Sequence, residues 1–309
     1  MDSSKFLMSI VTVFLAAAPG SCFGAQQSAP GTSVSVVVTL EPRREKSVPA
    51  VEQQDITVYQ DKDKRPVTGF VPLHGSMQLL ILIDDSARSS FSTEIGTLKQ
   101  FVTALPASTE VAIGYMRNGY TQMAQNFTGD HAAAAKAIRL PMGPGGADVS
   151  PYESLADAVK KWPNSGAERK EVIMISSGIE GLGGGFYRDN PYVMAGIDAA
   201  VKAGVVVYTI YNPSVGHYGH SLWRTTWGQN FLSELSDQTG GESYMVGFGS
   251  PVSFQPFLEQ IMDHQSHQYL LTFVARPEQK SGFQPFRVVI ENKDASIAAP
   301  DRVYVKASM

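Results

Sequence analysis

The stretch Met77–Ser90, MQLLILIDDSARSS, decides the fold of this chain. Its first half is apolar apart from Gln78, and it ends abruptly in two carboxylates, Asp84 and Asp85, and a cluster of hydroxyls. A continuous apolar run of this length is typical of a strand that is buried on both faces of a parallel sheet. Open α/β sheets place ligand sites at the carboxyl ends of their strands, so the carboxylates indicate such a site. The alternative is that Asp85 or Ser86 only caps the next helix.

Strands and helices alternate after this stretch. The helices that apolar spacing predicts cover residues 91–105, 131–138, 154–162, 192–203, 230–239 and 254–264. The predicted strands of the same region cover residues 79–83, 110–116, 121–127, 170–177, 205–211 and 243–246. This alternation predicts an α/β fold with a doubly wound, mostly parallel, Rossmann-like sheet over residues 77–266.

Short β-rich segments precede and follow the alternation. Their predicted strands are 34–40, 56–59 and 67–71 before it, and 269–275, 286–291 and 303–307 after it. Neither set has enough strands to be stable alone. We therefore expect residues 33–76 and 267–309 to pair with each other in one small β module.

The composition is that of an ordinary globular protein. The 309 residues carry a net charge of -4 and no basic run, which argues against nonspecific nucleic-acid binding. The chain has one cysteine, Cys22, so an intrachain disulfide and a thiolate metal cluster are both excluded.

The amino terminus has the features of an export signal. Lys5 precedes an apolar core, Phe6–Pro19, that is too short to span a membrane comfortably, and small residues follow it. We expect residues 1–24 to be a signal peptide and residues 25–32 a flexible tether. Lipid attachment at Cys22 is an alternative, although the aliphatic residue expected three positions upstream is missing. No later apolar stretch approaches ~20 residues, so we expect a periplasmic or extracellular protein without a transmembrane segment.

Two segments of the α/β region resemble those of a known protein family. LLILIDDSARSS, followed by an amphipathic helix and then by KEVIMISSG, resembles a von Willebrand factor type A (VWA) domain. The flanks VYQDKDKRPVTGF, HQYLLTFVA and FRVVIE are similar to those of the bacterial secreted, VWFA-related subgroup. The resemblance covers nearly the whole mature chain.

The resemblance implies a metal-ion-dependent adhesion site. Family members often hold a divalent cation, usually Mg²⁺, on an Asp-x-Ser-x-Ser run, a Thr from a second loop and an Asp from a third, and oxygen ligands of this kind suit a hard ion. The corresponding positions here are Asp84, Ser86, Arg88, Glu153 with Ser150 and Ser154 close by, and Ser177. Three of the five therefore depart from the family pattern, and one of them introduces a cation.

Two hypotheses follow for this degenerate site. In the first, the Arg88 guanidinium neutralises Asp84 as a metal would, and no cation is tightly bound. In the second, Asp84, Ser86, Glu153 and waters hold Mg²⁺ or another divalent cation while Arg88 turns to solvent. The Arg at 88 and the missing Asp at 177 favour the first.

A long aromatic loop is expected at the same edge, over Asn212–Gln229 (NPSVGHYGHSLWRTTWGQ). Its residue types dominate interface hot spots, and a loop of this length is unusual without a role. The candidate partner-binding residues are Asp85, Tyr218, His220, Trp223, Arg224 and Trp227. The alternative is that both Trp rings fold onto the domain as a lid. His217 and His220 lack a third ligand for Zn²⁺.

An enzyme is the less favoured alternative. Ser221 lies one residue from a nucleophile elbow, but Trp223 fills the position that needs a glycine. Glu180 and Asp189 are carboxylates on the same edge that would serve as acid and base in a hydrolase. Without a nucleophile–base pair, we expect a non-enzymatic, exported protein that binds a protein or peptide partner. A structural subunit of an envelope assembly is the third alternative.

Overall fold

The structure, a computed structural model, describes residues 31–43, 47–87, 91–143, 150–183, 185–213, 221–247 and 252–307. The predicted signal peptide, residues 1–24, and most of the predicted tether lie outside these residues. None of the described helices is long and apolar enough to cross a membrane.

Within the described residues, a six-stranded sheet forms the centre of the α/β domain. Its strands are β5 (Met77–Asp84), β6 (Thr109–Arg117), β7 (Tyr120–Thr128), β8 (Arg169–Ser176), β9 (Val205–Tyr211) and β10 (Ser243–Tyr244). They lie in the order β10-β9-β8-β5-β6-β7, and only the edge strand β7 runs antiparallel to its neighbour. This is a doubly wound order that changes direction at β5.

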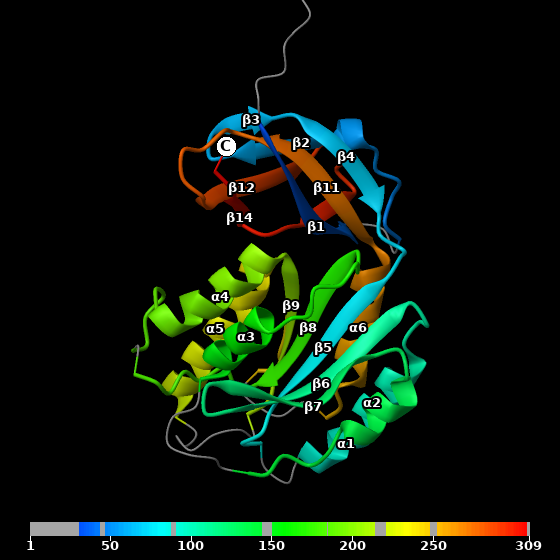
Figure 1. The fold of residues 1–309 in the computed structure, drawn as a ribbon, viewed down its shortest axis with the longest axis vertical. Coiled ribbons are helices and arrows are strands. Elements are labelled where there is room, and N and C mark those ends of the chain that lie inside the picture. The colour runs from blue at the N-terminus through cyan, green and yellow to red at the C-terminus, as the bar shows by residue number, and fades with distance from the viewer. Residues whose placement is uncertain are drawn as a thin grey trace, which may run out of the picture. The chain divides into compact units, whose positions relative to one another are not determined.

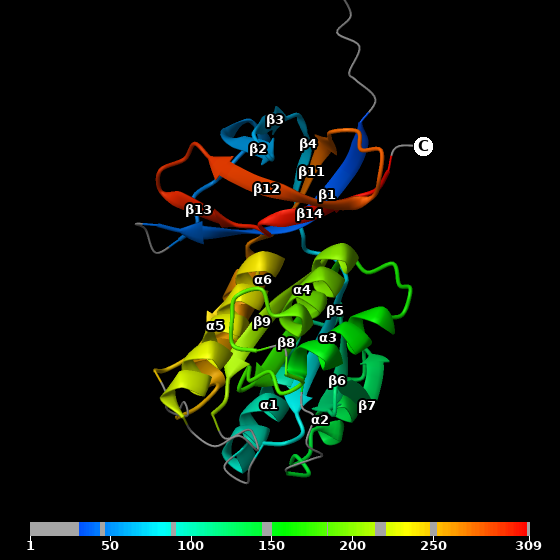
Figure 2. The ribbon, with the colours of Figure 1, turned by 90° about the vertical axis from the view of Figure 1, so that its left-hand side faces the viewer.

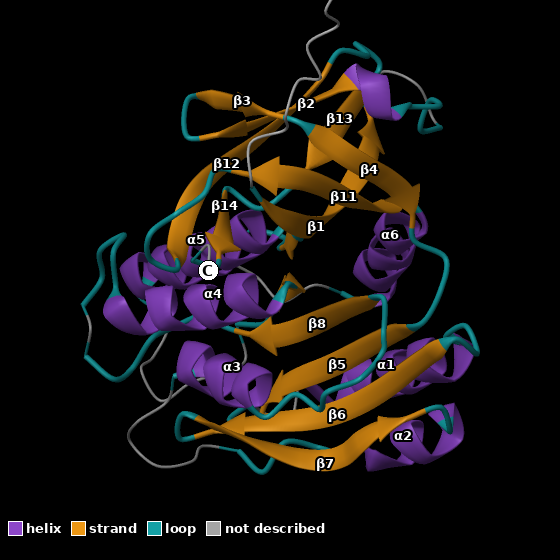
Figure 3. Ribbon diagram, turned by 45° about the horizontal axis from the view of Figure 1, so that its top comes forward, coloured by secondary structure: helices purple, strands orange, loops and turns teal. Residues whose placement is uncertain are grey.

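Helices cover both faces of this sheet (Figures 1 and 3). They are α1 (Ser92–Ala104), α2 (His131–Ala137) and α6 (Gln255–Ser266) on one face, and α3 (Pro151–Lys160), α4 (Pro191–Ala203) and α5 (Leu222–Thr239) on the other. The side chains of β5 alternate between the two cores: Leu79 and Ile81 join the first, whereas Leu80 and Leu82 join the second. All eight residues of β5 are buried, which explains why the strand is apolar at nearly every position.

The two terminal segments form a β module of two antiparallel sheets. The described strands are β1 (Thr32–Pro42), β2 (Ile56–Gln60), β3 (Asp63–Arg65), β4 (Val67–Pro72), β11 (Gln268–Ala275), β12 (Gly282–Ile290), β13 (Ala295–Ala298) and β14 (Arg302–Val305), with a 3-10 turn at Gln53–Asp55. The sheet orders are β13-β1-β11-β4 and β14-β12-β2-β3. Each sheet therefore pairs strands from both terminal segments, through β1 with β11 and β13 and β4 with β11 in the first, and through β2 with β12 in the second (Figure 2). The predicted fold class, including a β module built from both terminal segments, is confirmed.

The core of the β module lies between its two sheets. Val38, Val58 and Phe273 are fully buried there, and the Phe273 ring stacks on Phe286 with 5.2 Å between centroids. Each sheet buries one apolar face against the other, which is why neither terminal segment could fold without its partner.

The predicted start of α5 is wrong. The helix begins at Leu222 rather than at residue 230, so Trp223, Arg224 and Trp227 belong to a helix and not to a loop. Ser221 is its N-cap, with the hydroxyl accepting a hydrogen bond from Arg224 N at 3.2 Å.

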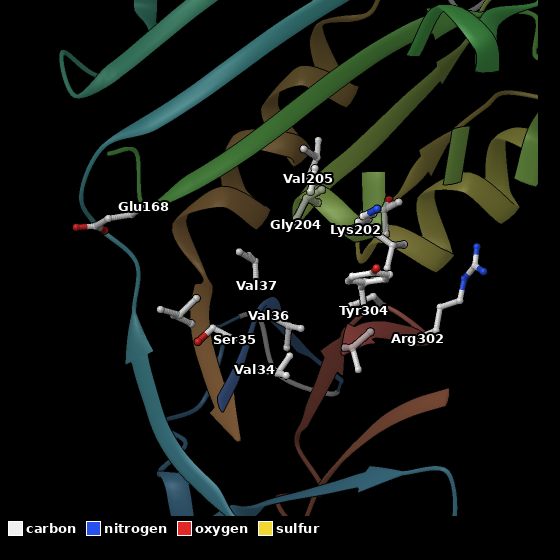
Figure 4. Close-up of a pocket in the computed structure, with 17 residues that line it drawn as sticks. Val34, Ser35, Val36, Val37, Glu168, Lys202, Gly204, Val205, Arg302 and Tyr304 are labelled. Atoms are coloured by element: carbon white, nitrogen blue, oxygen red, sulfur yellow. The ribbon is translucent and has the colours of Figure 1, made fainter. Parts of the chain in front are cut away.

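Strand β14 lies against the carboxyl end of α4, and β1 lies across a cavity from it. Arg302 Nη2 is 2.6 Å from Asp198 Oδ1, and Lys202 Nζ lies 4.9 Å from the centroid of the Tyr304 ring. A cavity of about 310 Å³ separates these elements elsewhere, and Figure 4 shows Val36 and Val37 of β1 on one side and Gly204 and Val205 on the other.

Candidate functional site

The carboxyl ends of β5 and β8 bring Asp84 and Ser176 together. The register pairs Ile83 with Ile175, so the next residues along the two strands are neighbours. Asp84 Oδ1 accepts hydrogen bonds from Ser86 N at 3.0 Å and Ser86 Oγ at 2.7 Å, and Oδ2 accepts one from Ser176 Oγ at 3.3 Å. All three side chains are buried. The Asp84 carboxylate is therefore held by three donors from its own chain.

The charge of Asp84 is not neutralised within the described part of the chain. Burial raises the pKa of Asp84, the hydrogen bonds from Ser86 and Ser176 oppose this rise, and the charge of Asp85 adds to it. No described Lys, Arg or His forms an ion pair with Asp84. Arg88, the predicted counter-ion, lies outside the described residues, so its pairing with Asp84 stays a prediction.

Asp85 has a different environment from its neighbour. Its side chain is fully buried, Oδ1 lies 2.7 Å from Arg139 Nη1, and Oδ2 lies 3.3 Å from Arg117 Nη1. Oδ1 also accepts a hydrogen bond from Met142 N at 3.0 Å. Asp85 thus joins the end of β6 to the segment after α2. With no exposed surface, its side chain orders the site from within rather than presenting itself to a partner.

A second polar cluster lies at the start of α3. Ser150 is the N-cap of this helix, accepts a hydrogen bond from Glu153 N at 3.1 Å, and donates one to Glu180 Oε2 at 2.5 Å. Glu180 also accepts a hydrogen bond from Leu182 N at 2.6 Å. Burial raises the pKa of Glu180, and the nearby charge of Glu153 contributes to the rise. This cluster fastens α3 to the loop after β8.

Glu153 and Ser177 are not brought to Asp84 by any described hydrogen bond. Glu153 is half-buried in the first turn of α3, and Ser177 is buried, with its hydroxyl accepting a hydrogen bond from Ile179 N at 3.4 Å. The hydroxyl of the ISSG segment that donates a hydrogen bond to Asp84 is that of Ser176, and the ligand role of Ser177 stays a prediction.

Helix α5 approaches the loop after β8 through two glycines. A Cβ on Gly228 would lie 2.3 Å from the carbonyl oxygen of Ser177, and one on Gly178 would lie 2.2 Å from the carbonyl oxygen of Gly228. Gly178 also has φ of +68°, a left-handed conformation that favours glycine. These contacts set the distance between α5 and the site.

The two tryptophans of α5 have different surroundings. The Trp227 ring is half-buried and lies 5.4 Å from the Phe231 ring, so it packs on the domain as the lid alternative supposed. The Trp223 side chain is 57% exposed and contacts the Phe186 ring at 4.4 Å. Arg224 is half-buried. The other predicted loop residues, His217, Tyr218 and His220, lie outside the described part of the chain.

Exposed apolar side chains are concentrated at the same edge of the sheet. Seven of the large apolar residues that are at least half exposed lie in the β6–β7 hairpin, in the segments that follow α2 and β8, at the start of α5 or directly after β10: Tyr120, Leu140, Met142, Tyr187, Leu222, Trp223 and Val246. Exposed apolar groups that gather in one region mark interaction sites more often than scattered ones do. Such an arrangement is suited to binding.

The described residues beside Asp84 offer few ligands to a divalent cation. A hard ion of this kind takes six or more oxygen ligands, usually from more than one carboxylate. Among the described residues, Asp84 is the carboxylate that accepts hydrogen bonds from Ser86 and Ser176, and the adjacent Asp85 pairs with Arg117 and Arg139. Among the described residues, no group of three or more His, Cys, Asp or Glu side chains is placed to hold a metal.

The catalytic candidates are not assembled into a site by the described contacts. Glu180 is buried and bonded to Ser150, whereas Asp189 is exposed and contributes to the raised pKa of Glu234 in α5, which burial mainly causes. Ser221 caps α5.

Three residues of the site were missed from the sequence. Ser176 follows from the register of β5 and β8, and Arg117 from that of β5 and β6, because Asp84 pairs with Met116 and the following residues are therefore close. Arg139 reaches Asp85 from the segment after α2, for which the sequence carries no signal.

Solved structures with a similar fold come from several bacteria. BatB of Bacteroides thetaiotaomicron matches with a TM-score of 0.45 and 14% identity, over 62% of this chain and 99% of that chain. The vWF domain of the type V pili tip protein Mfa5 of Porphyromonas gingivalis matches with 0.43 and 12%, over 64% and 95%. The PilB minor pilin of Streptococcus sanguinis matches with 0.43 and 13%, over 67% and 64%.

These likenesses are too distant to carry an argument about function. No protein-family model and no curated protein sequence matches the chain. The central sheet has one antiparallel edge strand and helices on both faces, and the Asp84–Ser86 turn follows strand β5. In fold, the chain is similar to these solved structures, the vWF domain of Mfa5 among them.

Proposed function

We propose that this chain is an exported, non-catalytic protein that binds a protein or peptide partner at the carboxyl edge of its six-stranded sheet. The observation that carries the proposal is the gathering of seven exposed apolar side chains at this edge, from Tyr120 to Val246. Tyr and Trp are enriched in interface hot spots, and Met in interfaces. Exposure of apolar side chains to water is unfavourable in free energy, and burial against a partner relieves it.

The buried polar groups beneath this surface support a binding role. Asp84, Asp85 and Glu180 each accept hydrogen bonds or ion pairs from groups of their own chain. They fix the loops after β5 and β8, and rigid loops lose less entropy when a partner binds. The exposed side chains are thereby held on an ordered base.

The proposal includes no tightly bound divalent cation. Asp84 brings a single negative charge to the site, and its carboxylate already accepts hydrogen bonds from Ser86 and Ser176, so the described residues do little to stabilise a doubly charged ion there. Calorimetric titration with Mg²⁺ and Mn²⁺ tests this point. We expect no micromolar binding, and micromolar binding that Asp84→Ala abolishes would refute it.

Site-specific photo-cross-linking tests the binding role. A photoreactive phenylalanine at Trp223 or at Met142 is expected to cross-link a partner in cells that export the full chain. Val71 is the matched control, because it is 57% exposed like Trp223 but lies in β4 of the β module. Cross-links of equal yield at positions 71 and 223, or none at 142 and 223, would contradict the proposal.

A further inference from the structure

Two arginines share one carboxylate at the carboxyl edge of the sheet. Arg117 and Arg139 both pair with Asp85, and a guanidinium stays charged at neutral pH. Asp84, the adjacent carboxylate, forms no described ion pair with either arginine. With Asp84 counted, two carboxylates face two arginines, but both carboxylates are buried and cannot meet a ligand.

The two guanidinium groups are partly exposed to solvent. The side chains of Arg117 and Arg139 are 27% and 35% exposed, whereas Asp85 is fully buried beneath them. Only Nη1 of Arg117 has a hydrogen-bond partner among the described residues, at 3.3 Å. Its Nε and Nη2 donors thus remain for an incoming acceptor. A guanidinium presents its donors in a planar fork that matches a carboxylate.

The second arginine is held in place from both sides. The guanidinium carbon of Arg139 lies 3.8 Å from the centroid of the Tyr115 ring, and Nη1 donates to Leu140 O at 2.9 Å. Tyr115 OH also donates to Arg139 O at 3.0 Å and accepts a hydrogen bond from Arg139 N at 2.7 Å. Because these contacts already order the side chain, a ligand need not order it.

Exposed apolar residues adjoin this charged centre directly. Tyr120 pairs with Arg117 across the β6–β7 hairpin, Leu140 follows Arg139, and Met142 donates its backbone N–H to Asp85. Their side chains are 65%, 52% and 66% exposed. We call Arg117, Tyr120, Arg139, Leu140 and Met142 the arginine patch. It joins exposed apolar surface to two partly exposed guanidinium groups.

We infer that the arginine patch binds an acidic segment of the partner protein, with an Asp or Glu side chain on the guanidinium groups and apolar neighbours on Tyr120 and Met142. Charge complementarity selects this occupant, since a basic segment would meet two guanidinium groups and a neutral one would leave the Arg117 donors without an acceptor. The inference rests on the proposed function, because it names the chemistry of the partner at the same edge.

Selection of random twelve-residue peptides displayed on phage against the immobilised mature chain tests the inference. Selected peptides are expected to be enriched in Asp and Glu next to apolar residues. Replacing the carboxylate of a selected peptide by its amide is expected to weaken binding at least tenfold, and so is Arg117→Gln. The matched control is Arg287→Gln, which alters an exposed arginine whose guanidinium carbon lies 4.5 Å from the Tyr59 ring centroid in the β module.

A second variant covers the case in which Arg117→Gln perturbs folding. Met142→Glu adds a negative charge at an exposed position without touching the Asp85 ion pairs, and it is expected to abolish binding of the acidic peptides. Selected peptides without excess carboxylates, or acidic ones that bind Met142→Glu as tightly as the wild type, would overturn the inference. If such neutral peptides lose binding in Trp223→Ala, the inference fails and the proposed edge stands. Peptides that bind Met142→Glu and Trp223→Ala as tightly as the wild type would overturn both the inference and the proposed function.

Discussion

The close approach of α5 to the loop after β8 predicts that alanine substitutions at two glycines, Gly228 and Gly96, change the stability of the protein in opposite directions. Gly228 lies inside α5, and a Cβ there would lie 2.3 Å from the carbonyl oxygen of Ser177. Gly96 lies inside α1 on an exposed face, and a Cβ there would meet nothing within 4 Å. The two positions therefore share a helical context and differ in the space available.

The magnitudes follow from this difference in space. Gly96→Ala is expected to stabilise the protein by about 0.5–1 kcal/mol, since alanine restricts the unfolded chain and suits the helix. Gly228→Ala gains a similar amount but must force α5 away from the Ser177 backbone, and overpacking costs about 1–3 kcal/mol. A backbone oxygen cannot rotate away as a side chain can, so we place the cost near ~3 kcal/mol. The net expectation is a loss of about 2 kcal/mol.

Urea denaturation and thermal melting of the mature chain measure both effects. A loss of 2 kcal/mol corresponds to a fall in Tm of roughly 4–8 °C for a domain of this size, while Gly96→Ala should raise Tm. A Gly228→Ala protein as stable as the Gly96→Ala protein would refute the reasoning, because it would mean that α5 does not press on the loop after β8.

Two further substitutions test the buried charges. Asp85→Asn is expected to lower the free energy of unfolding by about 3 kcal/mol, because it leaves two arginines without their counter-ion. The control Asp63→Asn, at the exposed pair with Arg276, should lower it by less than ~0.5 kcal/mol. Equal effects of the two substitutions in urea denaturation would contradict the ion-pair account. Burial raises the pKa of Glu171 above its value in the unfolded chain. Between these two pKa values the native state keeps the carboxyl proton that the unfolded state releases, so the free energy of unfolding falls as pH rises through this range. Glu171→Gln should therefore raise Tm more at pH 8 than at pH 4, unlike the exposed control Glu259→Gln, and a pH-independent difference would be the contrary result.

The architecture was predictable because the signals for it are strong and local. An apolar run without alternation, Leu79–Ile83, requires cover on both faces, and two clusters of helices supply it. The pairing of the two terminal segments followed from strand number alone. Which terminal strand joins which of the two sheets depends on packing between Val38, Val58 and Phe273, and no local pattern encodes that choice.

The site was predictable only in part, because its geometry depends on strand register. The motif pointed to Ser177, whose ligand role stays a prediction, but it gave no signal for the hydrogen bond that the register of β5 and β8 lets Ser176 donate to Asp84. The predicted start of α5 was wrong because Gly228 weakens the helical pattern of the sequence. A residue without a side chain is required at position 228, since a Cβ there would meet the carbonyl oxygen of Ser177.

The most direct test of the account is the yield of the cross-link at Trp223 with and without divalent cations. The proposed edge binds through exposed apolar and arginine side chains, so the yield should be the same in Mg²⁺ and in EDTA, and it should fall with added salt if the arginine patch takes part. A cross-link that disappears in EDTA, returns with Mg²⁺ and is lost in Asp84→Ala would contradict the account.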